Sequence, residues 1–96
     1  MKKYIVYILE CSDNSYYTGI TSNLEKRILE HTEGLKKGSY TFYRRPVKLV
    51  FYCEFTDVNW AIEKEKQIKK WSKAKKKALI DDKMELLPNL AKKKFM

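Results

Sequence analysis

The sequence is poor in the residues that most often bind metals, cross-link a chain or interrupt secondary structure. Its 96 residues include one histidine, two cysteines, two prolines and three glycines. Cys11 and Cys53 belong to no Cys-x-x-Cys pair, which argues against a structural zinc site. The sequence does not decide whether the two cysteines form a disulfide bond. No apolar run reaches the ~20 residues of a membrane-spanning helix, and the first run ends at Glu10 without a signal-peptide cleavage site. We therefore expect a cytoplasmic protein with reduced cysteines and no membrane partner.

Basic residues, by contrast, are abundant. The chain carries 21 lysines and arginines against 12 aspartates and glutamates, which gives a formal net charge of +9. Such an excess favours a polyanionic partner such as nucleic acid, while a role in solubility alone is the alternative. The length and the 44% hydrophobic content predict one globular domain over residues 1–96, with a core at about 4–82 and a basic tail at 83–96.

Three short runs of β-branched and aromatic residues predict strands. Tyr4–Leu9 is apolar on both faces, as a central strand would be. Tyr16–Thr21 follows after the turn-forming residues Ser12–Ser15, so the two runs form an antiparallel hairpin. The third strand is Val47–Phe55. One face of that strand is expected to carry Val47, Leu49, Phe51 and Cys53.

A helix is predicted between the second and third strands. Ser22 and Glu25 match a capping box that opens it, and Gly34 ends it. Its expected inner positions are Leu24, Ile28 and Leu35. A polar and basic loop then leads to the third strand.

Two further helices follow the third strand. The first is predicted over Val58–Trp71 with a cap at Thr56 or Asp57, and the second over Lys73–Asp81 with a cap at Ser72. The order strand, strand, helix, strand, helix, helix predicts an α+β fold, in which helices flank a three-stranded antiparallel sheet.

Two tyrosines of the hairpin are candidates for a shared site. Tyr7 and Tyr17 point to the same face of the sheet only if the hairpin loop has an odd number of residues or a bulge. A three-residue loop at Asp13–Ser15 meets this condition, whereas a two-residue turn places the rings on opposite faces. A shared face is therefore a structural requirement of any site that uses both phenols.

Arg27 and His31 lie one helical turn apart, so their side chains are neighbours beside the predicted buried stripe. Arginine offers a fixed charge and a planar fork suited to phosphate oxygens, and histidine relays protons near neutral pH. For either residue alone, the favoured interpretation is a surface arginine paired with a nearby glutamate, or a histidine at the core edge. The combination of Arg27 and His31 with two nearby tyrosines is what suggests a site that binds phosphate.

Glu65 interrupts an apolar helical stripe. That stripe is formed by Val58, Ala61, Ile62 and Ile68. A lone carboxylate placed there costs several kcal/mol unless a metal ion, a cation or water compensates for it. Mg²⁺ is a suitable partner, since it takes one or two carboxylates together with waters and phosphate. Pairing with Lys69, four residues on, is the competing interpretation.

Two basic segments are candidates for contact with nucleic acid. Lys64–Lys77 contains eight lysines, and Tyr40–Arg45 interleaves aromatic rings with arginines, which suits stacking on bases. The residues predicted to bind nucleic acid are Arg44, Arg45, Lys66, Lys69, Lys70 and Lys73. A solvated helix face and simple loop packing explain the same patterns.

The stretch from Tyr4 to His31 resembles the GIY-YIG nuclease domain. The first motif reads Ile5-Val6-Tyr7, and the second reads Tyr17-Thr18-Gly19 followed by Asn23–Arg27. Ala61–Lys70 matches the helix in which that superfamily carries a metal-binding glutamate, at Glu65. The chain departs from the pattern at Ile5, Thr18 and Ile20. The chain is similar over about residues 4–70 to the small bacterial members of the superfamily. Gly19 stands at the glycine of the second motif. A glycine within a strand often marks a point where another group approaches the backbone closely.

The resemblance implies hydrolysis of phosphodiester bonds in DNA with one divalent metal, Mg²⁺ or Mn²⁺, bound by Glu65. It assigns deprotonation of water to Tyr17, positioning of water or phosphate to Tyr7, stabilisation of charge to Arg27 and proton transfer or phosphate binding to His31. A module that binds nucleic acid without cleaving it is the alternative, and a basic protein-interaction adaptor is a third interpretation. A protein partner for targeting is compatible with each.

Overall fold

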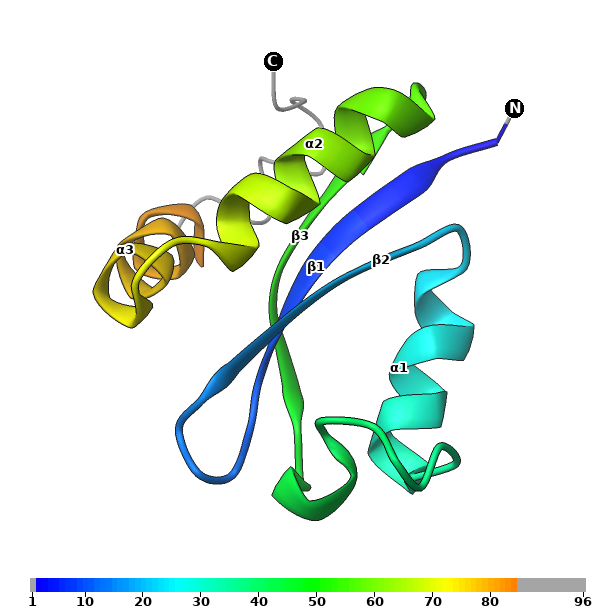
Figure 1. Ribbon diagram of the computed structural model, residues 1–96, viewed down its shortest axis with the longest axis vertical. Helices are drawn as coiled ribbons and strands as arrows, with labels where there is room; N and C mark the ends of the chain where they lie inside the picture. Colours follow the sequence, from blue (N-terminus) through cyan, green and yellow to red (C-terminus); the bar gives the residue numbers. More distant parts are fainter. Residues whose placement is uncertain (1, 85–96) are drawn as a thin grey trace.

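The structure is a computed structural model that describes residues 2–84 (Figure 1). Its elements are β1 (Tyr4–Glu10), β2 (Tyr16–Thr21), α1 (Leu24–Glu33), the 3₁₀ turn η1 (Phe42–Arg44), β3 (Lys48–Phe55), α2 (Val58–Lys69) and α3 (Lys73–Met84). The predicted order β-β-α-β-α-α is confirmed over this range. None of the helices within it has the length and apolarity needed to cross a membrane. The predicted basic tail lies outside the described residues from position 85 onward.

β1 is the central strand of the sheet. The strand order is β2-β1-β3, and both neighbours run antiparallel to β1. The side chains of Val6, Tyr7, Ile8 and Leu9 are all fully buried, which explains why this run is apolar on both faces. α1 lies on one side of the sheet, and α2 and α3 lie on the other (Figure 1).

The hairpin register places Tyr7 and Tyr17 on one face. Tyr7 is opposite Gly19 and Leu9 is opposite Tyr17, so the four residues share the face that α1 covers. The requirement of a shared face is therefore confirmed.

The loop that sets this register differs from the prediction by one position. The Cys11 amide donates to the Ser15 carbonyl, and the Asn14 amide donates back to the Cys11 carbonyl. Asn14 adopts a left-handed conformation with φ 68°, which short polar side chains tolerate. The three loop residues are thus 12–14 rather than 13–15. The count is odd in both cases, so the error leaves the faces unchanged.

The hydrophobic core lies on the face of the sheet opposite the one that α1 covers. Val6 and Ile8 of β1 pack there against residues of β3, α2 and α3, and the buried members contributed by those elements are Val50, Phe51, Cys53, Ala61, Ile68 and Ile80. Val58, expected in the buried stripe of α2, is 39% exposed because it is the first residue of the helix and lies beyond this cluster.

β3 starts at Lys48 and contains a bulge. Phe51 pairs with Ile8 but Leu49 pairs with Leu9, so one extra residue, Val50, is inserted between them. The predicted single face of alternate residues is therefore wrong on the N-terminal side of the bulge. There Leu49 joins the face of Leu9, while Phe51 faces the core.

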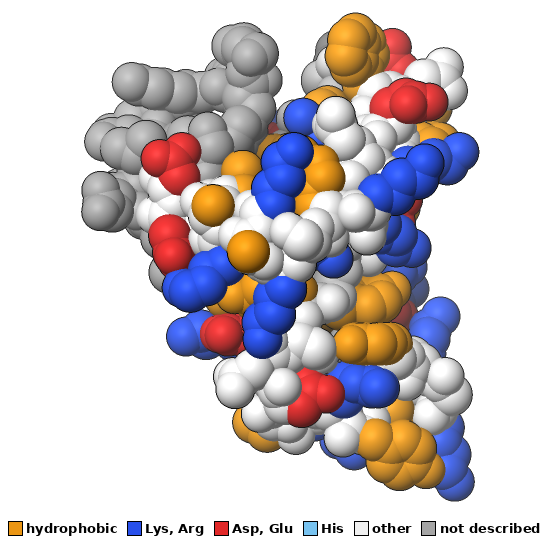
Figure 2. Space-filling model, turned by 60° about the vertical axis from the view of Figure 1, so that its left-hand side comes forward, with side chains coloured by type: hydrophobic (Ala, Val, Ile, Leu, Met, Phe, Trp, Pro, Cys, Tyr) orange, Lys and Arg blue, Asp and Glu red, His pale blue; other side chains and the backbone are white. Residues whose placement is uncertain are grey.

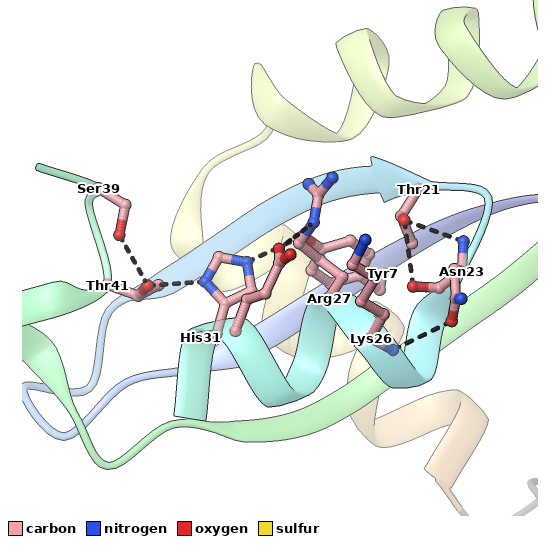
Figure 3. A network of polar contacts seen from close by, with 9 residues as sticks. Tyr7, Thr21, Asn23, Lys26, Arg27, His31, Ser39 and Thr41 are labelled. Carbon is pink, nitrogen blue, oxygen red and sulfur yellow. Dashed lines mark hydrogen bonds and ion pairs between the residues drawn. The ribbon is translucent and has the colours of Figure 1, made fainter. Parts of the chain in front are cut away.

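α1 is capped by Asn23 rather than by the predicted capping box. The Asn23 Oδ1 atom accepts a hydrogen bond of 3.0 Å from the Lys26 amide, and the Thr21 hydroxyl group accepts from the Asn23 amide at 3.0 Å (Figure 3). Because the Asn23 side chain takes the capping position, Ser22 and Glu25 do not form the box.

Gly34 ends α1 as predicted, with φ 64° and its amide donating to the His31 carbonyl. Leu35, expected as an inner position, comes after this reversal and is 61% exposed. The guanidinium group of Arg45 packs against Gly34, where a Cβ atom would lie 2.6 Å from Arg45 Cζ. Glycine is favoured here by its backbone conformation, whereas the exposed Arg45 side chain could move aside.

The ends of the last two helices need small corrections. Asp57 caps α2, with Oδ1 accepting from the Asn59 amide at 2.8 Å, and Ser72 caps α3, with its hydroxyl group accepting from the Lys75 amide at 3.1 Å. α2 ends at Lys69 rather than at residue 71, and α3 continues to Met84 rather than ending at residue 81. Both caps are among those predicted from the sequence.

Candidate active site

One small pocket brings together three of the predicted site residues. Tyr17, Arg27 and His31 line a cavity of about 230 Å³ together with residues of α1 and of the loop after it. The additional lining residues are Glu30, Lys36 and Ser39. Tyr7 is fully buried, and its Oη atom lies 3.1 Å from His31 Nε2 (Figure 3). The hairpin and α1 therefore place four of the five predicted catalytic and metal-binding residues around one point.

His31 is held at both ring nitrogens. Its Nε2 atom contacts the Tyr7 hydroxyl group, and its Nδ1 atom lies 2.7 Å from Thr41 Oγ1. Burial, and then the nearby charge of Arg27, lower the pKa of His31 below its ordinary value. The imidazole ring is therefore neutral at pH 7, when it can accept a proton.

Burial also acts on Tyr7. It raises the pKa of the Tyr7 phenol to about 12, and the proximity of Tyr17 adds to this, while Arg27 opposes it as a charge and as a hydrogen-bond donor. Tyr7 therefore keeps its proton at neutral pH.

Tyr17 lies between the buried pair and the surface. Its ring centroid is 5.1 Å from that of His31 and 6.3 Å from that of Tyr7. On its other side Tyr40 stacks at 5.9 Å with an interplanar angle of 27°. Tyr17 is thus the phenol of the pair that a ligand in the pocket meets first, since it lines the cavity and is only partly buried.

Arg27 is paired with a glutamate of its own helix. Arg27 Nε lies 3.1 Å from Glu30 Oε1, and the side chain of Glu30 is 19% exposed. Although this contact is an ion pair in distance, Glu30 Oε1 is buried and makes no hydrogen bond of good geometry with the described residues. The pairing with a nearby glutamate, left open by the sequence, is present, and it lies inside the pocket.

Glu65 does not line this pocket. Its side chain is 12% exposed, and its Oε2 atom lies 2.9 Å from Lys69 Nζ, as the competing interpretation of the sequence expected. The hydrogen bond to Glu65 is the main cause that raises the pKa of Lys69, and Tyr17 adds to the same effect. The pKa of Lys69 is therefore influenced by both Glu65 and Tyr17, although α2 packs on the core side of the sheet.

The donor set fits a divalent ion only in part. Residues 2–84 contain no group of three or more histidine, cysteine, aspartate or glutamate side chains that could hold a metal. A single carboxylate is compatible with Mg²⁺, which usually retains waters and takes substrate phosphate as further ligands. Glu65 is thus suited to hold an ion together with a bound phosphate rather than in a protein cage.

The two arginines predicted to bind nucleic acid already have partners within the protein. Arg44 lies 3.2 Å from Asp13 Oδ2 and stacks over Tyr40, with Cζ 3.9 Å from the ring centroid. Arg45 donates to the Phe42 carbonyl at 2.9 Å. Arg44 thereby ties the loop that carries Tyr40 to the hairpin turn, and Arg45 stabilises the 3₁₀ turn of the same loop.

The predicted lysines are more accessible. Lys66 and Lys70 are exposed and line an open groove on α2 beside Trp60, which is 68% exposed. Lys73 lies 6.0 Å from the ring centroid of Tyr16. On the side of α2 and α3, basic side chains are spread among apolar and acidic ones rather than gathered in one stripe (Figure 2).

Gly19 is needed because Tyr7 lies against it. A Cβ atom at Gly19 would lie 2.5 Å from Tyr7 Oη, and Tyr7 is fully buried and cannot move aside freely. We expect Gly19→Ala to lower the free energy of unfolding by about 1–3 kcal/mol through overpacking. Gly38→Ala is the matched control, because no atom lies within 4 Å of a Cβ there. Urea unfolding measures both, and equal midpoints for the two variants would contradict the prediction.

The raised pKa of Tyr7 gives the protein a measurable pH dependence. In the unfolded chain this phenol ionises near pH 10, whereas in the folded protein it ionises near 12. Its contribution to stability is thus present below pH 10 and is lost as the pH rises to 12, by an amount of the order of 2–3 kcal/mol. We expect the stability difference between wild type and Tyr7→Phe to decrease over this range in urea unfolding. A difference that stays constant from pH 9 to 12 would refute this.

Sequence reasoning missed Thr41 and Glu30 as parts of the site. Thr41 is 1% exposed and contacts His31 from a loop whose conformation no local pattern specifies. Glu30 follows Arg27 at helical spacing, and that spacing was the available signal.

Comparison with known proteins identifies relatives in sequence and in structure. Residues 3–78 match the model of the GIY-YIG catalytic domain. A UPF0213 protein of Syntrophus aciditrophicus is 50% identical over 80 residues, covering 83% of this chain and 92% of the relative. A UPF0213 protein of Staphylococcus haemolyticus is 44% identical over 82 residues, covering 85% and 99%. The solution structure of a UPF0213 protein from Bacillus halodurans is similar with a TM-score of 0.59 and 35% identity, covering 98% of this chain and 99% of that one.

Proposed function

Because the chain belongs to the GIY-YIG catalytic domain family, we propose that it is a metal-dependent endonuclease that hydrolyses phosphodiester bonds in DNA. The observation that carries the proposal is the meeting of Tyr7, Tyr17, Arg27 and His31 at one pocket, from two strands and one helix. A phenol pair, a neutral imidazole and a guanidinium group supply what hydrolysis of a phosphodiester needs: proton transfer and stabilisation of negative charge.

Each side chain has a distinct role in this proposal. Arg27 binds the oxygens of the scissile phosphate and stabilises the charge that develops on them. Tyr17, at the cavity wall, assists deprotonation of the attacking water. Tyr7 positions the water or the phosphate, and His31 accepts a proton through the ring nitrogen that contacts Tyr7.

Glu65 is the residue that would hold the divalent metal. A bound ion neutralises phosphate charge and lowers the pKa of water. The Glu65 carboxylate contacts Lys69 through Oε2, and its second oxygen would be available to such an ion.

Substrate binding is assigned to the basic surface. A net charge of +9 favours a polyanion, and lysines such as Lys66 on α2 and Lys70 just after it are exposed. This attraction is independent of base sequence, and binding that depends on it weakens as salt is added. The second candidate function, a module that binds without cleaving, rests on the same charge together with the position of Glu65 outside the pocket.

The test is cleavage of plasmid, single-stranded and branched DNA, each with Mg²⁺, with Mn²⁺ and with a chelator. Cleavage of one substrate that the chelator abolishes would support the nuclease. Salt-dependent binding without cleavage under all conditions would overturn it in favour of the binding module. An absence of salt-dependent binding to any of the three would instead favour a protein-interaction adaptor.

A further inference from the structure

The hydrogen bonds around His31 define the direction in which its protons point. Within the described residues, the Tyr7 hydroxyl group is hydrogen-bonded to His31 Nε2 at 3.1 Å, and its pKa, raised by burial, is lowered in part by the nearby guanidinium group of Arg27. A guanidinium group only donates. The proton of the Tyr7 hydroxyl group therefore has Nε2 as its acceptor, and a buried hydroxyl group without an acceptor would be costly.

The hydrogen bond from Tyr7 to His31 also determines which nitrogen of the imidazole ring carries the proton. A neutral imidazole that accepts at Nε2 carries its own proton on Nδ1. The Nδ1 proton then points at Thr41 Oγ1, 2.7 Å away, and the Thr41 hydroxyl group can in turn donate to Ser39 Oγ at 3.4 Å. Each group in the series therefore donates to the next one, from Tyr7 through His31 and Thr41 to Ser39. Figure 3 shows these contacts as dashed lines.

We propose that Thr41 is a positioning residue that holds His31 in the tautomer with its proton on Nδ1, so that Nε2 faces Tyr7 as a proton acceptor. The proposal rests on the proposed function for its catalytic meaning. Thr41 is suited to this role because it is 1% exposed and lies in the turn that opens η1, whose Arg44 amide donates to the Thr41 carbonyl at 3.0 Å. Neither water nor a loop movement easily replaces a hydroxyl group held in this way.

The same contact acts on the charged form of the ring. An imidazolium donates from both nitrogens, so Thr41 supports it through a charge-assisted bond when His31 takes up a proton. The titratable and charged groups that face His31 are Tyr7, Tyr17, Arg27, Glu30 and Lys36. These groups stay in place when only the hydroxyl group at position 41 is removed.

The experiment uses nitrogen NMR on the full chain, in which His31 is the sole histidine and its ring signals need no assignment by mutation. In the wild type we expect a protonated Nδ1 and an unprotonated Nε2 at neutral pH. Thr41→Val removes the hydroxyl group at nearly constant shape. It should yield a mixture of tautomers and a lower pKa of His31. Thr41→Ser keeps the hydroxyl group and should restore the tautomer and the pKa.

Kinetics supply the second arm on the cleaved substrate. Thr41→Val should lower kcat about ten-fold, a part of the roughly 10²–10⁴-fold that a positioned general acid or base contributes, with KM changed less, and Thr41→Ser should restore it. A wild-type ring protonated on Nε2 would overturn the proposal, as would an unchanged tautomer in Thr41→Val. The wild-type spectrum decides the tautomer even if Thr41→Val does not fold or no DNA is cleaved, so failure of the nuclease proposal is distinguishable from failure of this one.

Discussion

Replacing Glu65 with glutamine is expected to lower kcat about a thousand-fold while DNA affinity and folding change little. If Glu65 holds the metal, its loss removes several kcal/mol of stabilisation of the transition state, and each 1.36 kcal/mol is worth a factor of ten. Stability should be nearly unaffected, because the partner Lys69 is 55% exposed and such a pair contributes little. Single-turnover cleavage, filter binding and urea unfolding measure the three quantities.

Glu63→Gln is the matched control for this variant. It removes the same charge two residues earlier on the same helix, from an exposed side chain. Cleavage that persists in Glu65→Gln at the wild-type rate would show that the metal lies elsewhere or that the activity belongs to a contaminant. Equal losses in both variants would point to a general effect of charge on α2.

Arg27→Ala is expected to reduce kcat about a hundred-fold and to weaken DNA binding far less. A fixed donor aimed at developing charge contributes about this much to turnover. For binding, one phosphate contact is small beside 21 basic residues. Cleavage under single-turnover conditions separates the two effects, because it isolates the chemical step from affinity.

Two further variants sharpen the assignment of Arg27. Lys26→Ala removes the same charge from the neighbouring, exposed position and should leave kcat near the wild-type value. Glu30→Gln removes the anion 3.1 Å from Arg27 Nε and tests whether that pair merely occupies the guanidinium group. If Arg27→Ala reduces binding and turnover equally, Arg27 only tethers the substrate and has no special role in the chemical step.

Local patterns determined much of the fold and part of the site. The parity of the hairpin loop could be reasoned from turn chemistry, and parity alone decides whether Tyr7 and Tyr17 share a face. A one-residue error in the loop position was harmless for that reason. Helical spacing brought Arg27 and His31 to the same side of α1. These inferences succeeded because each depends on contacts within a few residues along the chain.

The remaining features depend on contacts between distant segments. The bulge at Val50 follows from the pairing of β3 with β1, and no local pattern in β3 indicates it. Thr41 meets His31 only because the loop after α1 folds back over the helix. Glu65, assigned to the metal through family resemblance, is not among the residues that line the pocket, and α2 packs against the core face through Ala61 and Ile68. Side-chain periodicity specified which stripe is buried but not which distant residues it meets.

One row of stacked and paired side chains fixes the position of Tyr17. Its members are Tyr17, Tyr40, Arg44 and Asp13. Tyr40 stacks on Tyr17, Arg44 lies over the ring of Tyr40, and Asp13 of the hairpin turn forms an ion pair with Arg44. Tyr17, which lines the pocket, is thus linked through Tyr40 and Arg44 to the hairpin turn. The conformational entropy of these side chains is lost during folding, so if the pocket binds phosphate as proposed, Tyr17 needs little further ordering at encounter.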